Sequence, residues 1–170
     1  MASSSKADRN ALIIRMVALA LVSILALEWF KANYVIGVDE QEIKCIPGVD
    51  YVIGNLNDRE IQRGQIYIVE SEGLEPLFKN GTLLVKFLRA LPGDRVTVNE
   101  RGVFVNGEQV ADAGLPNAEK LGREPADFYG ERVLGEDEYW ILGTTPESFD
   151  SRYWGSVTYD QIKARAYPIL

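Results

Sequence analysis

The sequence contains no histidine and only one cysteine, Cys45, among its 170 residues. Histidine is the side chain that ordinarily exchanges protons near neutral pH, so acid–base chemistry here must use a lysine, a carboxylate or Cys45. One thiol cannot form a disulfide within the chain, and without histidine it cannot supply the usual zinc-binding sets. A glycine-rich phosphate-binding loop is missing as well. We therefore expect neither a metal nor a cofactor.

Basic residues are in the minority, because 18 Lys and Arg stand against 25 Asp and Glu and the net charge is −7. No cluster of basic residues with interleaved aromatic residues is present, so we expect no nucleic-acid partner. The sequence has no internal repeat and no low-complexity tract. Its length suits one domain with a short appendage.

The appendage is an apolar run over residues 11–30, long enough to cross a hydrocarbon core of roughly 30 Å. Arg15 can extend toward the headgroups at one end, and Trp29 and Phe30 lie where an aromatic belt forms. The alternative is a signal peptide, whose apolar part is normally shorter. We find no small-x-small cleavage site at the end of the run, which favours a retained anchor.

Basic residues before the run, including Lys6 and Arg9, predict its orientation. By the positive-inside rule the N-terminus stays in the cytoplasm and the rest of the chain is exported. We expect a disordered cytoplasmic tail over residues 1–10, a transmembrane anchor over residues 11–31 and an exported domain over residues 32–170.

Beyond the span the sequence predicts a mainly β domain. Short runs rich in β-branched and aromatic residues alternate with turn signals. Asn106-Gly107 indicates a hairpin, because these residues accept the positive φ angles of a type I′ turn. We expect residues 111–137 to form a loop. The predicted strands cover residues 51–53, 65–70, 82–88, 95–98, 103–110 (the hairpin), 139–142 and 161–170.

Lys86 lies within one of these apolar strands and is followed by the turn Leu91-Pro92-Gly93-Asp94. Burying an ammonium group is costly, so Lys86 is a poor structural choice. A buried lysine is a good general base, because its neutral amine can accept a proton. The alternative is an exposed lysine that protects an edge strand from aggregation.

A second block of polar residues runs from Ser148 to Gly155 and contains Asp150 and Arg152. Asp150 and Arg152 are expected to form a structural ion pair that holds the loop. The alternative is a turn capped by serine and aspartate, which explains the residue types but not the whole run.

These two blocks resemble those of the membrane-anchored type I signal peptidases, and within them the conjugative-transfer pilin peptidases. The resemblance runs from the anchor to the C-terminus. It implies an antiparallel β fold with a nucleophile–lysine dyad, in which Lys86 is the base, Ser148 orients it, and Asp94 supports the site. It also implies a single-pass protein of the bacterial inner membrane with a periplasmic catalytic domain.

The nucleophile block of that family has a serine followed closely by proline, and this sequence has Cys45-Ile46-Pro47-Gly48 instead. We interpret Cys45 as the nucleophile, with Pro47 supporting it. The alternatives are a buried structural cysteine or Ser71, which lies in an acidic loop without a proline. The family's hydroxyl two residues before the nucleophile is replaced by Ile43, so the oxyanion must rely on backbone N–H groups such as that of Cys45.

Gly143-Thr144-Thr145 stands where the family has Gly-Asp-Asn. The expected substrate is an exported precursor protein such as a conjugative pilin, held at the lipid bilayer near the conjugation machinery. A thioester on Cys45 would favour attack by an amine, and so cyclisation of the pilin. The other hypotheses are a general secretory signal peptidase and a catalytically silent anchored component of a secretion complex.

Overall fold

The computed structural model describes residues 2–38, 44–75 and 78–169. The chain divides into two compact units, Met1–Tyr34 and Val35–Leu170, which we describe separately. The first unit is the helix α1 (Ala2–Asn33). It starts at Ala2, so the prediction of a disordered tail over residues 1–10 is wrong. No glycine or proline interrupts the chain between Ala2 and Asn33, and nothing in the sequence therefore stops the helix from including the polar start.

The apolar part of α1 is long enough to cross a membrane by length and composition. The candidate span is Asp8–Asn33, 26 residues with a mean hydropathy of 2.3. Large apolar side chains are exposed on every side of the helix, which is typical of a spanning helix rather than one lying on a surface. At its end, Asn33 Nδ2 donates to the Trp29 carbonyl at 2.7 Å.

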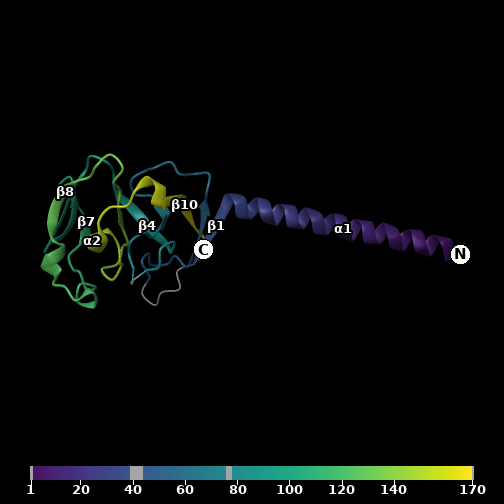
Figure 1. Cartoon of the computed structure of the whole chain (residues 1–170), viewed down its shortest axis with the longest axis horizontal. Coiled ribbons are helices and arrows are strands. Elements are labelled where there is room, and N and C mark those ends of the chain that lie inside the picture. The colour runs from purple at the N-terminus through teal and green to yellow at the C-terminus, as the bar shows by residue number, and fades with distance from the viewer. Residues whose placement is uncertain (1, 39–43, 76–77, 170) are drawn as a thin grey trace. The chain divides into compact units, whose positions relative to one another are not determined.

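The second unit is built from antiparallel strands. Its described residues form a six-stranded sheet of order β1-β2-β10-β3-β4-β9 and a four-stranded sheet of order β7-β6-β5-β8. In Figure 1, β7 and β8 lie on one side of β4, and β10 and β1 on the other. The strands are β1 (Tyr34–Val38), β2 (Tyr51–Asn55), β3 (Ile66–Glu70), β4 (Leu83–Ala90), β5 (Arg95–Asn99), β6 (Gly102–Val105), β7 (Glu108–Asp112), β8 (Gly130–Val133), β9 (Trp140–Leu142) and β10 (Ile162–Ile169). The helical turns are η1 (Glu119–Leu121), η2 (Pro125–Phe128), α2 (Ser151–Trp154) and η3 (Tyr159–Gln161).

The mainly β architecture confirms the predicted fold class, and the hairpin is confirmed in detail. Asn106 has a φ of 52° and Gly107 a φ of 88°, the positive pair that a type I′ turn requires. Two strands were missed. All four residues of β8 are exposed, so it carries no alternating pattern and was taken as loop. β1 follows α1 directly and is not among the predicted strands.

β4 is an interior strand that pairs with β3 on one side and with β9 on the other. Its side chains alternate as the pleat requires: Leu84, Lys86 and Leu88 are buried, whereas Phe87 and Arg89 on the opposite face are half-buried. Lys86 is therefore not an exposed lysine on an edge strand.

The last strand of the large sheet, β9, also packs against the small sheet. Trp140 and Leu142 belong to one buried cluster with Val96 and Val103 of β5 and β6. This shared core fixes the end of β9, and the polar loop that follows it, against both sheets.

Candidate active site

Lys86 reaches two polar side chains from the middle of β4. Its Nζ lies 2.7 Å from Cys45 Sγ and 2.8 Å from Ser148 Oγ. Lys86 and Ser148 are each 2% exposed and Cys45 is 7% exposed, so the three groups meet in a site that is nearly shielded from water. The structure thus brings together the three residues that the sequence predicted as catalytic.

Cys45 stands immediately before a tight turn. The Val49 N–H donates to the Ile46 carbonyl at 3.3 Å, and Gly48 has a φ of 78°. Proline at the second position and glycine at the third are the residues that a type II turn prefers. Pro47 is exposed, so it supports the site through the turn rather than by contact with Lys86. Ile43 lies outside the described residues.

The Ser148 side chain that reaches Lys86 fills the space beside Gly143, which has no side chain of its own. A Cβ placed on Gly143 would lie 2.1 Å from Ser148 Oγ, closer than real Cβ atoms come to other atoms, and 3.0 Å from the Cys45 carbonyl oxygen, which is tighter than most real Cβ contacts. Any side chain at position 143 would displace Ser148. Sequence reasoning placed Gly143 in the loop without recognising this requirement, because close approach between segments leaves no local pattern.

The loop that carries Ser148 is held by a buried ion pair. Arg152 Nε and Nη2 each donate to the Asp150 carboxylate at 2.8 Å, and Arg152 Nη2 also donates to the carbonyls of Thr145 and Ser148 at 3.0 and 3.1 Å. Asp150 accepts from the Gly143 N–H at 2.8 Å. The predicted ion pair therefore fixes both ends of the turn that presents Ser148.

Burial by itself lowers the pKa of the Arg152 guanidinium, but the hydrogen bonds and charge of Asp150 outweigh it and hold that pKa above its ordinary value. A smaller contribution in the same direction comes from Cys45. Arg152 thus places a permanent positive charge near Cys45 and also braces the loop.

Thr144 and Thr145 connect the same loop to the nucleophile segment. The Thr144 N–H donates to the Cys45 carbonyl at 2.9 Å, and the Thr144 hydroxyl donates to that oxygen at 3.3 Å. The Thr145 hydroxyl donates to the Lys44 carbonyl at 3.2 Å. The two threonines stand where the family has Asp and Asn, and no pattern in the sequence predicts these hydrogen bonds.

Two further residues weighed from the sequence lie elsewhere. The Ser71 hydroxyl donates to the Lys79 carbonyl at 2.8 Å and accepts from the Thr82 N–H at 3.1 Å, so it closes the connection between β3 and β4. Asp94 follows β4 and holds the turn into β5. Among described residues, no group of three Asp, Glu, His or Cys could hold a metal ion.

Asp94 is a stabilising anchor rather than part of the dyad. It accepts from the Leu91 N–H at 2.6 Å and from Asn106 Nδ2 at 2.7 Å, and it pairs with Arg63 Nη2 at 2.8 Å. Burial raises the pKa of its carboxyl, but these three donors outweigh burial and bring that pKa below its ordinary value.

Such a site suits acyl transfer, because an amine beside a thiol yields a nucleophilic sulfur in either of two ways. The pair can stand as thiolate and ammonium, or neutral Lys86 can take the proton during attack.

A family model described as "Signal peptidase, peptidase S26" matches residues 9–170. The chain belongs to this family.

Individual relatives agree with the membership. A probable signal peptidase I-2 of Synechocystis is 29% identical over 110 residues, which cover 64% of this chain and 48% of the relative. The plasmid transfer protein TraF of Escherichia coli is 32% identical over 89 residues, which cover 51% of this chain and 50% of the relative. This member of the S26 family therefore spans about half the length of these two relatives. A solved signal peptidase I of Enterococcus faecalis V583 is 24% identical, with a TM-score of 0.41, and the match covers 62% of this chain and 96% of that chain.

Proposed function

We propose that the protein is a membrane-anchored peptidase that cleaves an exported precursor protein with a Cys45–Lys86 dyad. The observation that carries the proposal is the placement of Lys86 Nζ between Cys45 Sγ and Ser148 Oγ, at 2.7 and 2.8 Å, in a buried site. Family membership supports the reaction class.

In the proposed reaction the Cys45 sulfur attacks the scissile carbonyl carbon after Lys86 has taken the thiol proton. The oxyanion is stabilised by backbone N–H groups, among them that of Cys45. The C–N bond then breaks, Lys86 gives its proton to the departing amine, and a thioester remains on Cys45. In the second half Lys86 takes a proton from the attacking water or amine, and the thiol is restored.

The dyad is tested by substitution of Cys45 in cells that contain the precursor. Cys45→Ala should abolish processing, and Cys45→Ser should retain part of it, because a hydroxyl serves as nucleophile elsewhere in the family. Ser71→Ala is the matched control and should process normally, since Ser71 serves the β3–β4 connection. Normal processing by Cys45→Ala would contradict the assignment.

The silent-component hypothesis predicts a different reactivity of the thiol. An activated Cys45 should be alkylated by iodoacetamide at neutral pH much faster in the unaltered protein than in Lys86→Met, because the substitution removes the proton acceptor. Equal alkylation rates in the two proteins would favour a component without catalytic function.

We further propose that residues 11–31 anchor the protein in the bacterial inner membrane, with residues 32–170 in the periplasm. Support comes from the apolar α1 and from the basic residues that precede its span. Protease added to spheroplasts should digest the large domain and spare the N-terminus. A protected large domain would reverse the topology.

For the substrate we propose a conjugative pilin, supported by the similarity to the plasmid transfer protein TraF. A thioester favours an amine over water more than an oxygen ester does, and a bound pilin N-terminus would have a high effective concentration. We therefore expect cyclisation of the pilin.

Intact-mass analysis separates cyclisation from hydrolysis, because a cyclic pilin is one water lighter than the linear chain of the same residues. The second candidate is a general secretory signal peptidase, favoured by the similarity to signal peptidase I-2. Processing of many unrelated exported precursors, and a free C-terminal carboxylate on the pilin, would support that candidate.

A further inference from the structure

A polar pocket of about 420 Å³ lies beside the dyad and takes no part in the reaction described above. Its walls come from three elements: Arg89 at the end of β4, the strand β7, and Gly143 and Thr144 in the loop after β9. The Thr144 N–H and hydroxyl donate to the Cys45 carbonyl oxygen, so this wall contacts the backbone of the proposed nucleophile.

The segment that carries Cys45 also borders a second hollow of different character. This hollow is much smaller and is lined mainly by apolar side chains, including Ile46, Val49 and Val85. A peptide whose scissile carbonyl lies at Cys45 Sγ extends in two directions. If its acyl side occupies the apolar hollow, its leaving side runs toward the polar pocket.

Arg89 brings an uncompensated charge to that pocket. Its guanidinium lies 4.6 Å from the centre of the Phe87 ring, and its buried Nε has no hydrogen-bond partner. Among the described residues, no carboxylate forms an ion pair with it. Asp112 lines the same pocket from the exposed end of β7, without reaching ion-pair distance of Arg89. Burial lowers the pKa of Arg89, because it disfavours the charged guanidinium. A bound anion would offset that desolvation cost.

β7 contributes backbone rather than charge. It is the edge strand of the small sheet, with β6 as its neighbour, and an edge strand exposes unpaired N–H and C=O groups. Its pairing with β6 shifts register between Val103 and Phe104, which leaves a bulge in β7 at Val110. Val110 lines the same pocket as Arg89. An extended peptide can pair along such an edge while a side chain enters the pocket.

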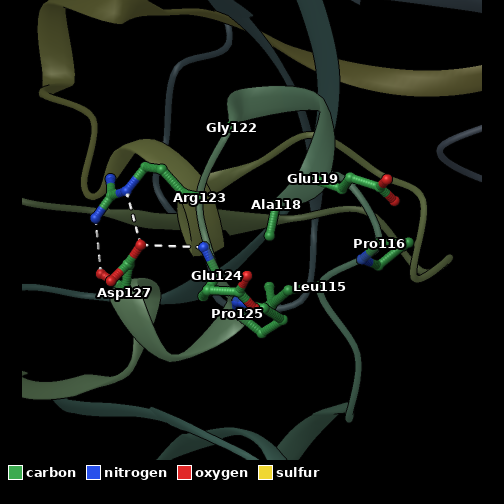
Figure 2. A pocket seen from close by; sticks show the side chains of 9 residues that line it. All are labelled: Leu115, Pro116, Ala118, Glu119, Gly122, Arg123, Glu124, Pro125 and Asp127. Atoms are coloured by element: carbon green, nitrogen blue, oxygen red, sulfur yellow. Dashed lines mark hydrogen bonds and ion pairs between the residues drawn. The ribbon is translucent and has the colours of Figure 1, made fainter.

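A larger pocket of about 650 Å³, formed by residues 115–127, shows what distinguishes the Arg89 pocket. There Arg123 already pairs with Asp127 at 3.6 Å, and Asp127 accepts from the Glu124 N–H at 3.1 Å (Figure 2). The arginine in that pocket is compensated by the protein itself, whereas Arg89 is not.

We propose that Arg89 binds a carboxylate on the leaving side of the substrate, while β7 pairs with its backbone. Arg89 would then be a specificity-determining residue for the proposed peptidase reaction, on which this inference rests. The carboxylate comes either from an acidic side chain or from the free C-terminus of the leaving segment. Both present the same chemistry to the guanidinium.

The test uses the full chain in detergent micelles and quenched-fluorescent peptides with alanines on the acyl side. One series moves a glutamate, or a glutamine in its place, through the first leaving-side positions. A second series ends in a free carboxylate or an amide. We expect one acidic peptide to have a kcat/KM roughly tenfold above its neutral counterpart, as befits a hydrogen bond to a charged group. The series in which the preference occurs identifies the source of the carboxylate.

Arg89→Gln should remove the preference, so that the acidic peptide and its neutral counterpart are cleaved with the same kcat/KM. Arg101→Gln is the matched control, because Arg101 also lies over a phenylalanine ring, at 5.5 Å from that of Phe104, but outside the pocket. It should keep the preference. An unaltered enzyme without an acid preference, or a preference that survives in Arg89→Gln, would overturn the inference.

A binding measurement keeps this test separate from the proposed function. If the unaltered protein cleaves none of the peptides, the peptidase proposal fails for them, and fluorescence anisotropy with Cys45→Ala still decides the pocket. The acidic peptide should bind roughly tenfold tighter than the neutral one, and the added Arg89→Gln should abolish the difference. Equal affinities for both peptides in Cys45→Ala would refute the carboxylate site.

Discussion

The two sides of the dyad are held in different ways. Lys86 projects from the middle of an interior strand, and its position follows from the register of β4 with β3 and β9. Cys45 lies on an irregular segment before β2, held by hydrogen bonds from a loop about a hundred residues later in the chain, at Thr144 and Thr145. The proposed base is positioned by regular structure and the proposed nucleophile by tertiary contacts.

This difference predicts how each side responds to substitution. Changes on the base side should act on chemistry and leave the fold intact, because the β-ladder does not depend on the lysine side chain. Changes at the threonines should shift the nucleophile by small amounts. Gly143 lies where the two sides meet, since a Cβ added there would approach both Ser148 and the Cys45 carbonyl oxygen.

The largest effect is expected at the base. Lys86→Met should lower kcat/KM by roughly 10²–10⁴-fold, because no proton acceptor remains beside Cys45. Lys86→Arg should be inactive as well, since a guanidinium is not deprotonated at working pH. The melting temperature of Lys86→Met should be unchanged or higher, because a buried amine is replaced by an apolar chain. An active Lys86→Arg enzyme would refute the role of Lys86.

The next effect tests the junction. Gly143→Ala should lower kcat by roughly 10²-fold, because the new methyl group pushes Ser148 away from the amine and general-base efficiency falls. Gly130→Ala is the control, since a Cβ there meets nothing within 4 Å. Steady-state kinetics at saturating substrate would show the contrast. Full activity in Gly143→Ala would mean that Ser148 does not orient Lys86.

A smaller effect is expected on the nucleophile side. Thr144→Val or Thr145→Val removes one hydroxyl donor and keeps the backbone contact from Thr144. One hydrogen bond has a net value of about 1 kcal/mol, so kcat/KM should fall roughly fivefold. Thr97→Val, which removes a hydroxyl bonded to Glu131 on the small sheet, should leave the kinetics unchanged. A hundredfold loss of kcat/KM in Thr144→Val would contradict this ranking, because the hydroxyl contact would then matter as much as the residues beside Lys86.

The smallest kinetic effect is expected at Asp94, which should matter for stability alone. Asp94→Asn should keep kcat/KM and lower the free energy of unfolding by roughly 1–3 kcal/mol at pH 7. The folded pKa of Asp94 lies below its ordinary value of 3.8, so its contribution is present above about that pH. It is lost as the pH falls further, through the folded pKa. Denaturant titrations at pH 7 and pH 3 measure the difference, and a cost that grew on acidification would contradict this sign.

The proximity of Lys86 and Cys45 could be predicted from the sequence, because each of the two residues lies in a distinctive local context. Lys86 lies in an apolar strand before a proline-glycine turn, and Cys45 precedes another such turn. What could not be predicted involves contacts between distant segments. Gly143 is required by the approach of Ser148, and the threonine hydroxyls act on carbonyls from another part of the chain. Neither leaves a periodic pattern.

The same distinction applies to the fold. Strands whose faces differ in burial, such as β4 and β5, were predicted within a few residues of their true bounds. β8 is exposed on both faces and gave no alternation to detect. Helix α1 extended through its polar start because nothing there breaks a helix.

The alternation along β4 also determines which changes of chain length the site tolerates. Leu84 and Leu88 share a face with Lys86, whereas Phe87 faces the other way. Deleting one residue of β4 before Lys86 would put a wrong side chain at the nucleophile and move the amine to the opposite face. Insertions into the connection over residues 71–82 leave this order unchanged. The site should therefore tolerate a change in the sequence spacing between Cys45 and Lys86, but not a shift of the lysine to the other face of its strand.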